Sequence, residues 1–239
     1  MENSITKTAH LERRDQDGPA CQDRGGFRNH PGAAPTSRAL LARRNSGSEQ
    51  GNPIPAGWFG PGAKPLEIDF GCHRGAFLVG MAELHPLVNF LGIERQAERV
   101  AKCNARIARL GLANALAVQG TGAQGLEFLP DGCCAVFHLY FPDPWPKRRH
   151  AARRVFQKDF LDAVRRVLAP GGTLRVMTDN EPYFLEMLEL VGALWTERKW
   201  DDGRERVPTA FEAVFSKLGK TPFRACLAPA GQDRIAGSR

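Results

Sequence analysis

The sequence predicts an α/β fold in which a mostly parallel, doubly wound sheet carries helices on both faces. From Leu66 onward, short apolar runs alternate with segments of helical spacing, and turns rich in glycine and proline separate them. The chain has 239 residues, which is enough for one large α/β domain with a complete core.

Each element follows from its own pattern. Five apolar runs of strand length are expected to form the parallel strands: Leu66–Phe70, Val88–Glu94, Leu116–Gln119, Ala135–Phe141 and Thr173–Thr178. Four segments have helical spacing: Phe77–Leu84, Ala97–Leu110, Lys158–Leu168 and Pro182–Leu194. The turn Pro170-Gly171-Gly172 cannot continue a helix and therefore ends the third of them. Phe211–Phe215 and Phe223–Leu227 are expected to add a closing antiparallel pair.

The composition divides the chain into three parts. Residues 1–60 lack hydrophobic periodicity and are rich in Arg, Gly, Asn, Ser and Pro, so we expect a disordered or loosely ordered extension. One folded domain is expected over residues 61–228, followed by a short tail over residues 229–239. Six cysteines show no C-x-x-C spacing, no signal-peptide pattern follows Met1, and no apolar run could span a bilayer. We therefore expect a cytoplasmic protein without a metal site or membrane contact.

The charge is basic and concentrated. Lys and Arg number 33 against 26 Asp and Glu, a net charge of +7. Eight of these cations and only three acids lie between Asp143 and Arg166. An isolated charged run is usually a solvated helix face, but this one adjoins Trp145 and His150 on a predicted loop, an arrangement typical of phosphate-binding surfaces.

The first strand leads into a glycine-bearing turn, L-E-I-D-F-G-C-H-R-G. Ligands of doubly wound sheets bind at the carboxyl ends of the strands, where Gly71 and Gly75 would let the backbone approach a ligand. Glu94 ends the second strand, 25 residues after Asp69, and could accept hydrogen bonds from the ribose hydroxyls of a nucleoside cofactor. Asp69 beside the turn would repel a pyrophosphate but suits the ammonium group of a methionine. The absence of G-x-G-x-x-G also disfavours a nicotinamide-dependent oxidoreductase.

The fourth strand ends in H-L-Y-F-P-D-P-W-P-K-R-R-H-A-A-R-R. Two prolines flank Asp143 and hold its carboxylate on a stiff loop at the end of the strand. Trp145 offers an aromatic face to a base, and the cations from Lys147 to Arg154 offer contacts to phosphates. His138, on the same strand, is expected to be a hydrogen-bonded core residue rather than a catalytic one.

These motifs resemble the bacterial tRNA (guanine-N7)-methyltransferases that modify position 46 in the variable loop. The resemblance covers about Leu66 to Leu227 and includes F-P-D-P-W-P-K-R-R-H, N-F-L-G-I-E, T-D-N-E-P-Y and T-A-F-E. It implies a Rossmann-like class I fold, S-adenosylmethionine as cofactor and tRNA as partner, with the oligomeric state, monomer or homodimer, left open.

The resemblance also implies roles for individual residues. Asp143 would be catalytic. The cofactor would be bound by Asp69, Gly71, Gly75, Glu94 and Thr121. The RNA substrate would be bound by Lys147, Arg148, His150, Arg153, Arg154, Asp179, Thr209 and Glu212.

Two residues depart from the family pattern, both on the cofactor side. His73 stands where the family has the middle glycine of its turn, a costly replacement if that position needs a positive φ. Thr121 stands where the family has an Asp after the third strand, and a hydroxyl hydrogen-bonds more weakly than a carboxylate. These departures leave open an RNA-binding relative without catalysis. The Asp143-Pro144-Trp145 loop, which is similar to loops that methylate exocyclic amino groups, leaves open a methyltransferase acting on another RNA position.

Overall fold

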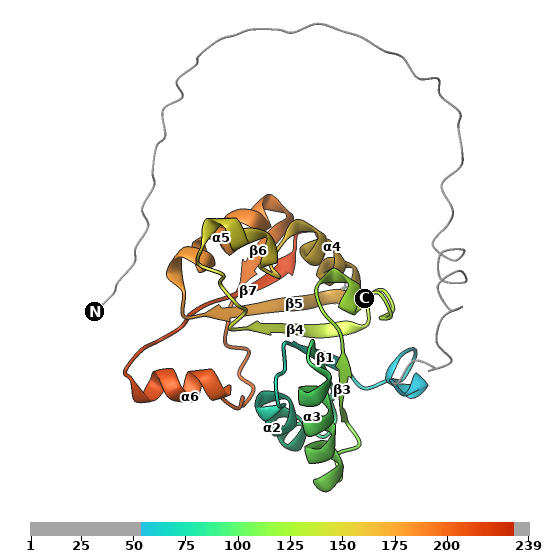
Figure 1. Cartoon of the computed structure of the whole chain (residues 1–239). Coiled ribbons are helices and arrows are strands. Elements are labelled where there is room, and N and C mark those ends of the chain that lie inside the picture. Colours follow the sequence, from blue (N-terminus) through green and yellow to red (C-terminus); the bar gives the residue numbers. More distant parts are fainter. Residues whose placement is uncertain (1–53, 232–239) are drawn as a thin grey trace, which may run out of the picture. The chain divides into compact units, whose positions relative to one another are not determined.

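The structure is a computed structural model that describes residues 54–231, and these form a seven-stranded sheet in the order β3-β2-β1-β4-β5-β7-β6 (Figure 1). The strands are β1 (Leu66–Phe70), β2 (Asn89–Glu94), β3 (Ala115–Gln119), β4 (Cys134–Tyr140), β5 (Leu168–Thr178), β6 (Trp195–Arg198) and β7 (Phe223–Pro229). The first five pair in parallel, and β7 pairs antiparallel with β5 and β6. The predicted doubly wound, mostly parallel sheet is confirmed.

Helices cover both faces of this sheet. They are α2 (Ala76–Leu84), α3 (Ala97–Arg109), α4 (Lys158–Val167), α5 (Glu181–Val191) and α6 (Ala210–Lys217), with 3-10 helices η1 (Ala56–Trp58), η2 (Ala123–Leu126), η3 (Arg148–Arg153) and η4 (Gly192–Leu194). The chain winds outward from β1 in one direction through β2 and β3, and in the other through β4 and β5. Because such crossovers are right-handed, α2 and α3 lie on one face and α4 and α5 on the other (Figure 1).

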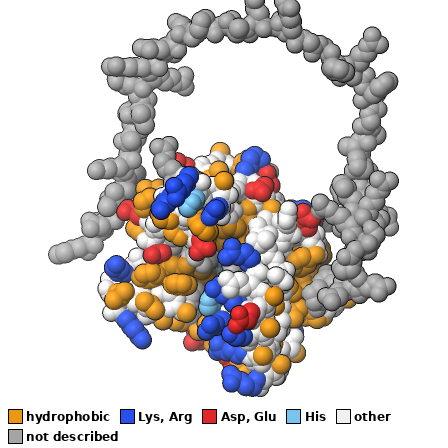
Figure 2. Space-filling model, viewed as in Figure 1, with side chains coloured by type: hydrophobic (Ala, Val, Ile, Leu, Met, Phe, Trp, Pro, Cys, Tyr) orange, Lys and Arg blue, Asp and Glu red, His pale blue; other side chains and the backbone are white. Residues whose placement is uncertain are grey.

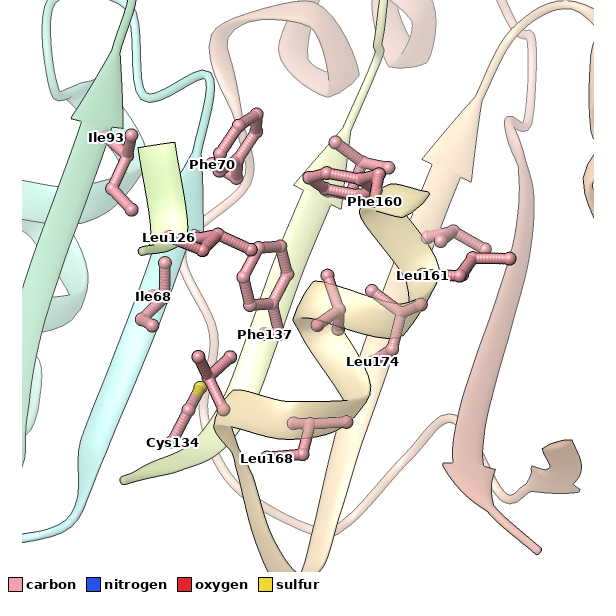
Figure 3. Packing of buried hydrophobic residues seen from close by; sticks show 14 of the residues in the cluster. Ile68, Phe70, Ile93, Leu126, Cys134, Phe137, Phe160, Leu161, Leu168 and Leu174 are labelled. Atoms are coloured by element: carbon pink, nitrogen blue, oxygen red, sulfur yellow. The ribbon is translucent and has the colours of Figure 1, made fainter. Parts of the chain in front are cut away.

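The core has two parts, one against each face of the sheet. In the larger part, Ile68, Phe137 and Leu174 of the strands pack against Phe160 and Leu161 of α4 (Figure 3). The smaller part joins residues of α2 and α3 to the other side of β2 and β3: Phe77, Leu78, Phe90, Cys103, Ile107 and Ala117. Together they anchor the strands whose carboxyl ends form the site described below.

Two predicted elements differ in the structure. Phe211–Phe215 was expected as a strand but belongs to α6. The strand that pairs with β7 on the side away from β5 is β6. The helix forms because Thr209 and Glu212 cap its first turn reciprocally. β5 also begins at Leu168 instead of Thr173. Leu168 pairs with Cys134 of β4, and Thr173 pairs with Val136 after a shift in register. The chain between them turns at Gly171, which has a φ of +77°.

The folded part of the chain extends further toward the N-terminus than residue 61. Ile54 and Trp58 are only 5% and 8% exposed and belong to the larger core cluster. The rest of the predicted extension, residues 1–53, and residues 232–239 of the predicted tail lie outside the described residues. None of the helices between residues 54 and 231 is long and apolar enough to cross a membrane.

Candidate active site

A cavity of about 830 Å³ opens where the predicted motifs meet, at the carboxyl ends of the parallel strands. Its walls come from the turns after β1, β2, β3 and β4 and from the start of α6. Of the predicted site residues, the walls include Asp69, Gly71, Glu94, Thr121, Asp143, Arg153 and Thr209. Residues from five separate chain segments therefore share one space, as expected for a doubly wound sheet.

The turn after β1 is built from left-handed backbone. Gly71, His73 and Gly75 have φ values of +83°, +54° and +72°. A Cβ at Gly75 would lie 2.2 Å from Sγ of Cys103 in α3, so no side chain fits there. The position of His73 does need a positive φ, as the sequence comparison with a glycine suggested. The turn is held closed because the backbone N–H of His73 donates to Oε2 of Glu94, at 3.1 Å.

Two buried acids face this turn. Asp69 and Glu94 are 6% and 5% exposed. Glu94 accepts hydrogen bonds from the backbone N–H groups of His73 and Gln96 and lies 3.6 Å from Arg99. For Asp69, burial and the nearby charge of Glu94 raise the pKa to about 7. Within residues 54–231, no hydrogen bond or cation offsets this effect.

The environment of Asp69 fits a cationic ligand group. A buried carboxyl with a raised pKa is stabilised when a positive charge is placed beside it. The α-ammonium of S-adenosylmethionine would supply such a charge, and Glu94 at the end of the next strand would take the ribose hydroxyls. Thr121 is exposed at the wall after β3, so its hydroxyl is accessible to a purine.

Asp69 is expected to make the chain less stable as the pH rises from about 4 to about 7. The pKa of Asp69 is higher in the folded state than in the unfolded state, so between these two values the folded protein retains a proton that the unfolded chain loses. The protonated carboxyl makes its full contribution to stability below the unfolded-state pKa. That contribution disappears as the pH rises through the folded-state pKa. Urea unfolding of wild type and Asp69→Asn at pH 5 and pH 8 tests this expectation. The variant should gain stability relative to wild type at pH 8, and an identical pH dependence of both proteins would contradict it.

Asp143 sits on a strained loop after β4. Phe141 and Trp145, on either side of Pro142-Asp143-Pro144, have φ values of +51° and +40°, unusual for aromatic residues. Arg154 fastens the loop from inside: its Nε donates to the carbonyl of Pro144 at 2.7 Å, and a terminal nitrogen donates to that of Trp145 at 3.3 Å. The loop holds the exposed carboxylate of Asp143 at the cavity wall.

The predicted RNA-binding cations divide into two groups. Lys147 is exposed, the guanidinium of Arg153 lies 5.1 Å from the centre of the Trp145 ring, and His150 meets the same ring edge-on. Arg154 does not face outward as predicted, because it braces the loop, pairs with Glu186 and covers the ring of Tyr183. The side chain of Arg148 lies outside the described part of the chain.

The other predicted substrate residues lie around the start of α6 and the end of β5. Thr209 lines the cavity and caps α6: its hydroxyl accepts from the N–H of Glu212, whose carboxylate accepts from the N–H of Thr209. Burial raises the pKa of Glu212, but hydrogen bonds from Arg206 and Thr209 outweigh it and hold the pKa below its usual value. Asp179 is exposed just beyond β5 and, like Glu212, is not part of the cavity wall.

The sequence reasoning missed the aromatic rings of Tyr140 and Phe141 at the cavity, whereas Phe211 lies in the stretch Thr209–Glu212 that the resemblance assigns to the substrate. Tyr140, Phe141 and Phe211 all line the cavity, and Phe141 stacks on Phe211 with ring centres 5.3 Å apart. Their positions in the sequence carried a signal, because Tyr140 and Phe141 directly precede the P-D-P motif and Phe211 lies within T-A-F-E. Within residues 54–231, no cluster of three or more His, Cys, Asp or Glu side chains could hold a metal ion.

A buried polar chain lies beneath the cavity. Nε2 of His138 lies 2.9 Å from Glu67, and Nδ1 lies 2.8 Å from the hydroxyl of Tyr140. Burial lowers the pKa of His138, so the neutral ring donates to the carboxylate and accepts from the tyrosine. Arg204 donates to the other oxygen of Glu67, at 2.7 Å. His138 is therefore a hydrogen-bonded core residue, as predicted.

Comparison with known proteins identifies the family. Residues 63–225 match a family model described as "Putative methyltransferase". A tRNA (guanine-N(7)-)-methyltransferase of Geobacillus kaustophilus is 33% identical over 168 residues, which are 67% of this chain and 77% of the relative. The chain belongs to the tRNA (guanine-N(7)-)-methyltransferase family. A second relative of that name, from Rhodospirillum rubrum, is 41% identical over 165 residues, 66% of this chain and 64% of the relative.

The fold agrees with membership in the tRNA (guanine-N(7)-)-methyltransferase family. The sheet has a mostly parallel, doubly wound, Rossmann-like topology, and the matched family model is that of a methyltransferase. Among solved structures, an aminoglycoside resistance methyltransferase is similar with a TM-score of 0.49 at 20% identity, covering 70% of this chain and 88% of that chain.

Proposed function

We propose that this chain transfers a methyl group from S-adenosylmethionine to N7 of guanine in tRNA, and that the guanine is at position 46 of the variable loop. The observation that carries the proposal is the cavity that joins two acidic turns to the Pro142-Asp143-Pro144 loop. Relatives named for this activity align with the chain over two thirds of its length. The assignment to position 46 rests on the resemblance of the loop and tail motifs to bacterial enzymes.

This reaction requires the protein to align the two substrates and does not require an acid or a base. When bound, S-adenosylmethionine supplies an electrophilic methyl group on a cationic sulfur. N7 of neutral guanine carries a lone pair, so no proton has to be removed before it attacks. The protein must then hold the nucleophile in line with the methyl group, and the stiff strand ends and the turn after β1 provide fixed positions for both.

Asp143 has two roles in this proposal. Methylation at N7 leaves the purine cationic, so a carboxylate nearby stabilises the charge that develops during the transfer. Its oxygens also accept hydrogen bonds from N1–H or the amino group of guanine, which selects this base. Lys147 and Arg153 contact phosphates of the tRNA, and the guanidinium of Arg153 lies over the ring of Trp145, two residues after Asp143.

Methyl transfer from labelled S-adenosylmethionine to an unmodified tRNA transcript tests the proposal. We expect the label in 7-methylguanine at position 46, and we expect its loss from a transcript in which adenine replaces that guanine. Label in 7-methylguanine elsewhere would overturn the assignment to position 46. If the transcript bound without any transfer, the chain would be an RNA-binding relative without catalysis, and His73 and Thr121 would be the first positions to restore.

A further inference from the structure

One side of α3 carries a row of five cations. Arg95, Arg99, Lys102, Arg106 and Arg109 follow one another in steps of four and three residues. Residues at such steps lie on the same side of a helix; four of the five lie in α3, and Arg95 lies two residues before its start. Figure 2 shows Lys and Arg side chains gathered over α3, and a second group lies across the same face beside a histidine. We call these five residues the α3 row.

Three residues of the α3 row, Arg95, Lys102 and Arg109, are exposed, Arg99 and Arg106 are half-buried, and the row is only partly neutralised. Lys102 pairs with Glu98 at 2.6 Å, and Arg99 lies 3.6 Å from Glu94. Within residues 54–231, Arg95, Arg106 and Arg109 have no acidic partner within 4 Å. The neighbouring exposed positions of the helix are small, Ala101, Ala105 and Ala108, so no bulky side chain shields the row.

The α3 row begins at the cavity. Arg95 and Arg99 line it together with Arg74 of the turn after β1. From there the row follows the helix away from the cavity, and the 13 residues of α3 rise about 20 Å. On the opposite side of the cavity wall stand Asp143, Trp145 and Arg153 of the loop after β4. The cavity therefore lies between two cationic surfaces.

We infer that the α3 row is a second contact surface for the tRNA backbone, which binds phosphates on the cofactor side of the cavity while Lys147 and Arg153 bind them on the other. This inference rests on the proposed function, because it takes the cavity to be the place where the target guanine enters. When one base of an RNA strand enters the cavity, the backbone of that strand extends away from the cavity in two directions. Cations on both sides of the cavity would therefore bind its phosphates and hold the strand in place.

The composition of the α3 row favours RNA over a membrane surface. An amphipathic helix that binds lipid carries large apolar side chains beside its cations. Here the apolar residues of α3 pack against α2 and the sheet: Cys103 and Ile107 are buried and Val100 is half-buried. What remains exposed on the helix is charged or small, which suits phosphates.

The salt dependence of tRNA binding tests the inference. The dissociation constant of an unmodified transcript is measured at several salt concentrations for wild type and for Arg106→Gln/Arg109→Gln, which lies beyond the cavity. We expect the variant to bind about tenfold more weakly at 0.1 M salt and the slope of log affinity against log salt to fall by about 1 to 2, since two phosphate contacts disappear. Binding of S-adenosylhomocysteine and the thermal unfolding midpoint should stay unchanged.

A matched control separates this contact from general charge. Arg165→Gln also removes an exposed arginine from the last turn of a helix, α4, but on the opposite face of the sheet. It should leave the slope unaltered, and single Arg109→Gln should lower it by about 1. An unchanged slope in the α3 variants, or an equal change in the control, would overturn the inference. Formation of 7-methylguanine by wild type is measured separately, so failure of the proposed function is distinguishable from failure of this contact.

Discussion

Replacing Asp143 with asparagine is expected to slow methyl transfer by about 10²-fold or more at saturating substrates. The carboxylate stands at the cavity wall on a loop fixed by two prolines and by Arg154. Asparagine keeps the size of the side chain but removes the negative charge that would stabilise the cationic purine, and loss of one such preorganised group typically costs this much. Single-turnover rates with an unmodified tRNA transcript measure the effect.

Two comparisons sharpen the test of Asp143. Asp159→Asn removes an exposed carboxylate in the first turn of α4, away from the cavity, and should leave the rate unchanged. A transcript with inosine at the target position lacks the 2-amino group. If Asp143 accepts a hydrogen bond from that group, wild type should methylate the inosine transcript more slowly than the guanine transcript. Asp143→Asn should methylate the two transcripts at nearly the same rate. Near wild-type turnover of Asp143→Asn would exclude both roles.

Replacing Glu67 with leucine is expected to lower the free energy of unfolding by about 3 kcal/mol. Glu67 is 2% exposed and holds both His138 and Arg204. Burial raises its pKa, but the hydrogen bonds from His138 and Arg204 outweigh this and keep the pKa below its usual value, so the carboxylate is charged at neutral pH. Leucine fills a similar volume but leaves the imidazole N–H of His138 without a partner and Arg204 paired with Asp202 alone.

Urea unfolding followed by linear extrapolation measures this loss. Lys158→Ala serves as the control, because it removes an exposed pair with Asp162 that should contribute less than about 0.5 kcal/mol. A loss in Glu67→Leu as small as in the control would mean that the buried chain contributes nothing beyond packing. The His138 and Tyr140 hydroxyl contact would then have to be tested through Tyr140→Phe.

Much of the site follows from local sequence. Strand–turn–helix units in a parallel sheet place the carboxyl ends of their strands at one edge, so the sequence alone predicts that Asp69, Glu94 and Asp143 lie close together. The glycines of the first turn were predictable in the same way, because their positive φ values are a property of the tight turn itself. T-A-F-E also contains the Ser/Thr-x-x-Glu pattern of a capping box, and its helix could have been predicted from it.

Other features depend on contacts between distant segments. Arg154 lies in a basic run that predicts an RNA-facing surface, but packing against the loop after β4 and pairing with Glu186 turn it inward. Arg204 reaches Glu67 across 137 residues of sequence. No local pattern of charge or spacing in the sequence predicts these partners.

What the sequence by itself determined is therefore the five parallel strands of a doubly wound sheet and the acids at their ends, since hydrophobic period and turn chemistry act over a few residues. Only the tertiary structure decided which cations are exposed to solvent beside the cavity and which are turned inward to pair with acids or backbone carbonyls. The physical reason is that burial of a charge is favourable only with a partner already in place, and in this chain that partner comes from a remote segment.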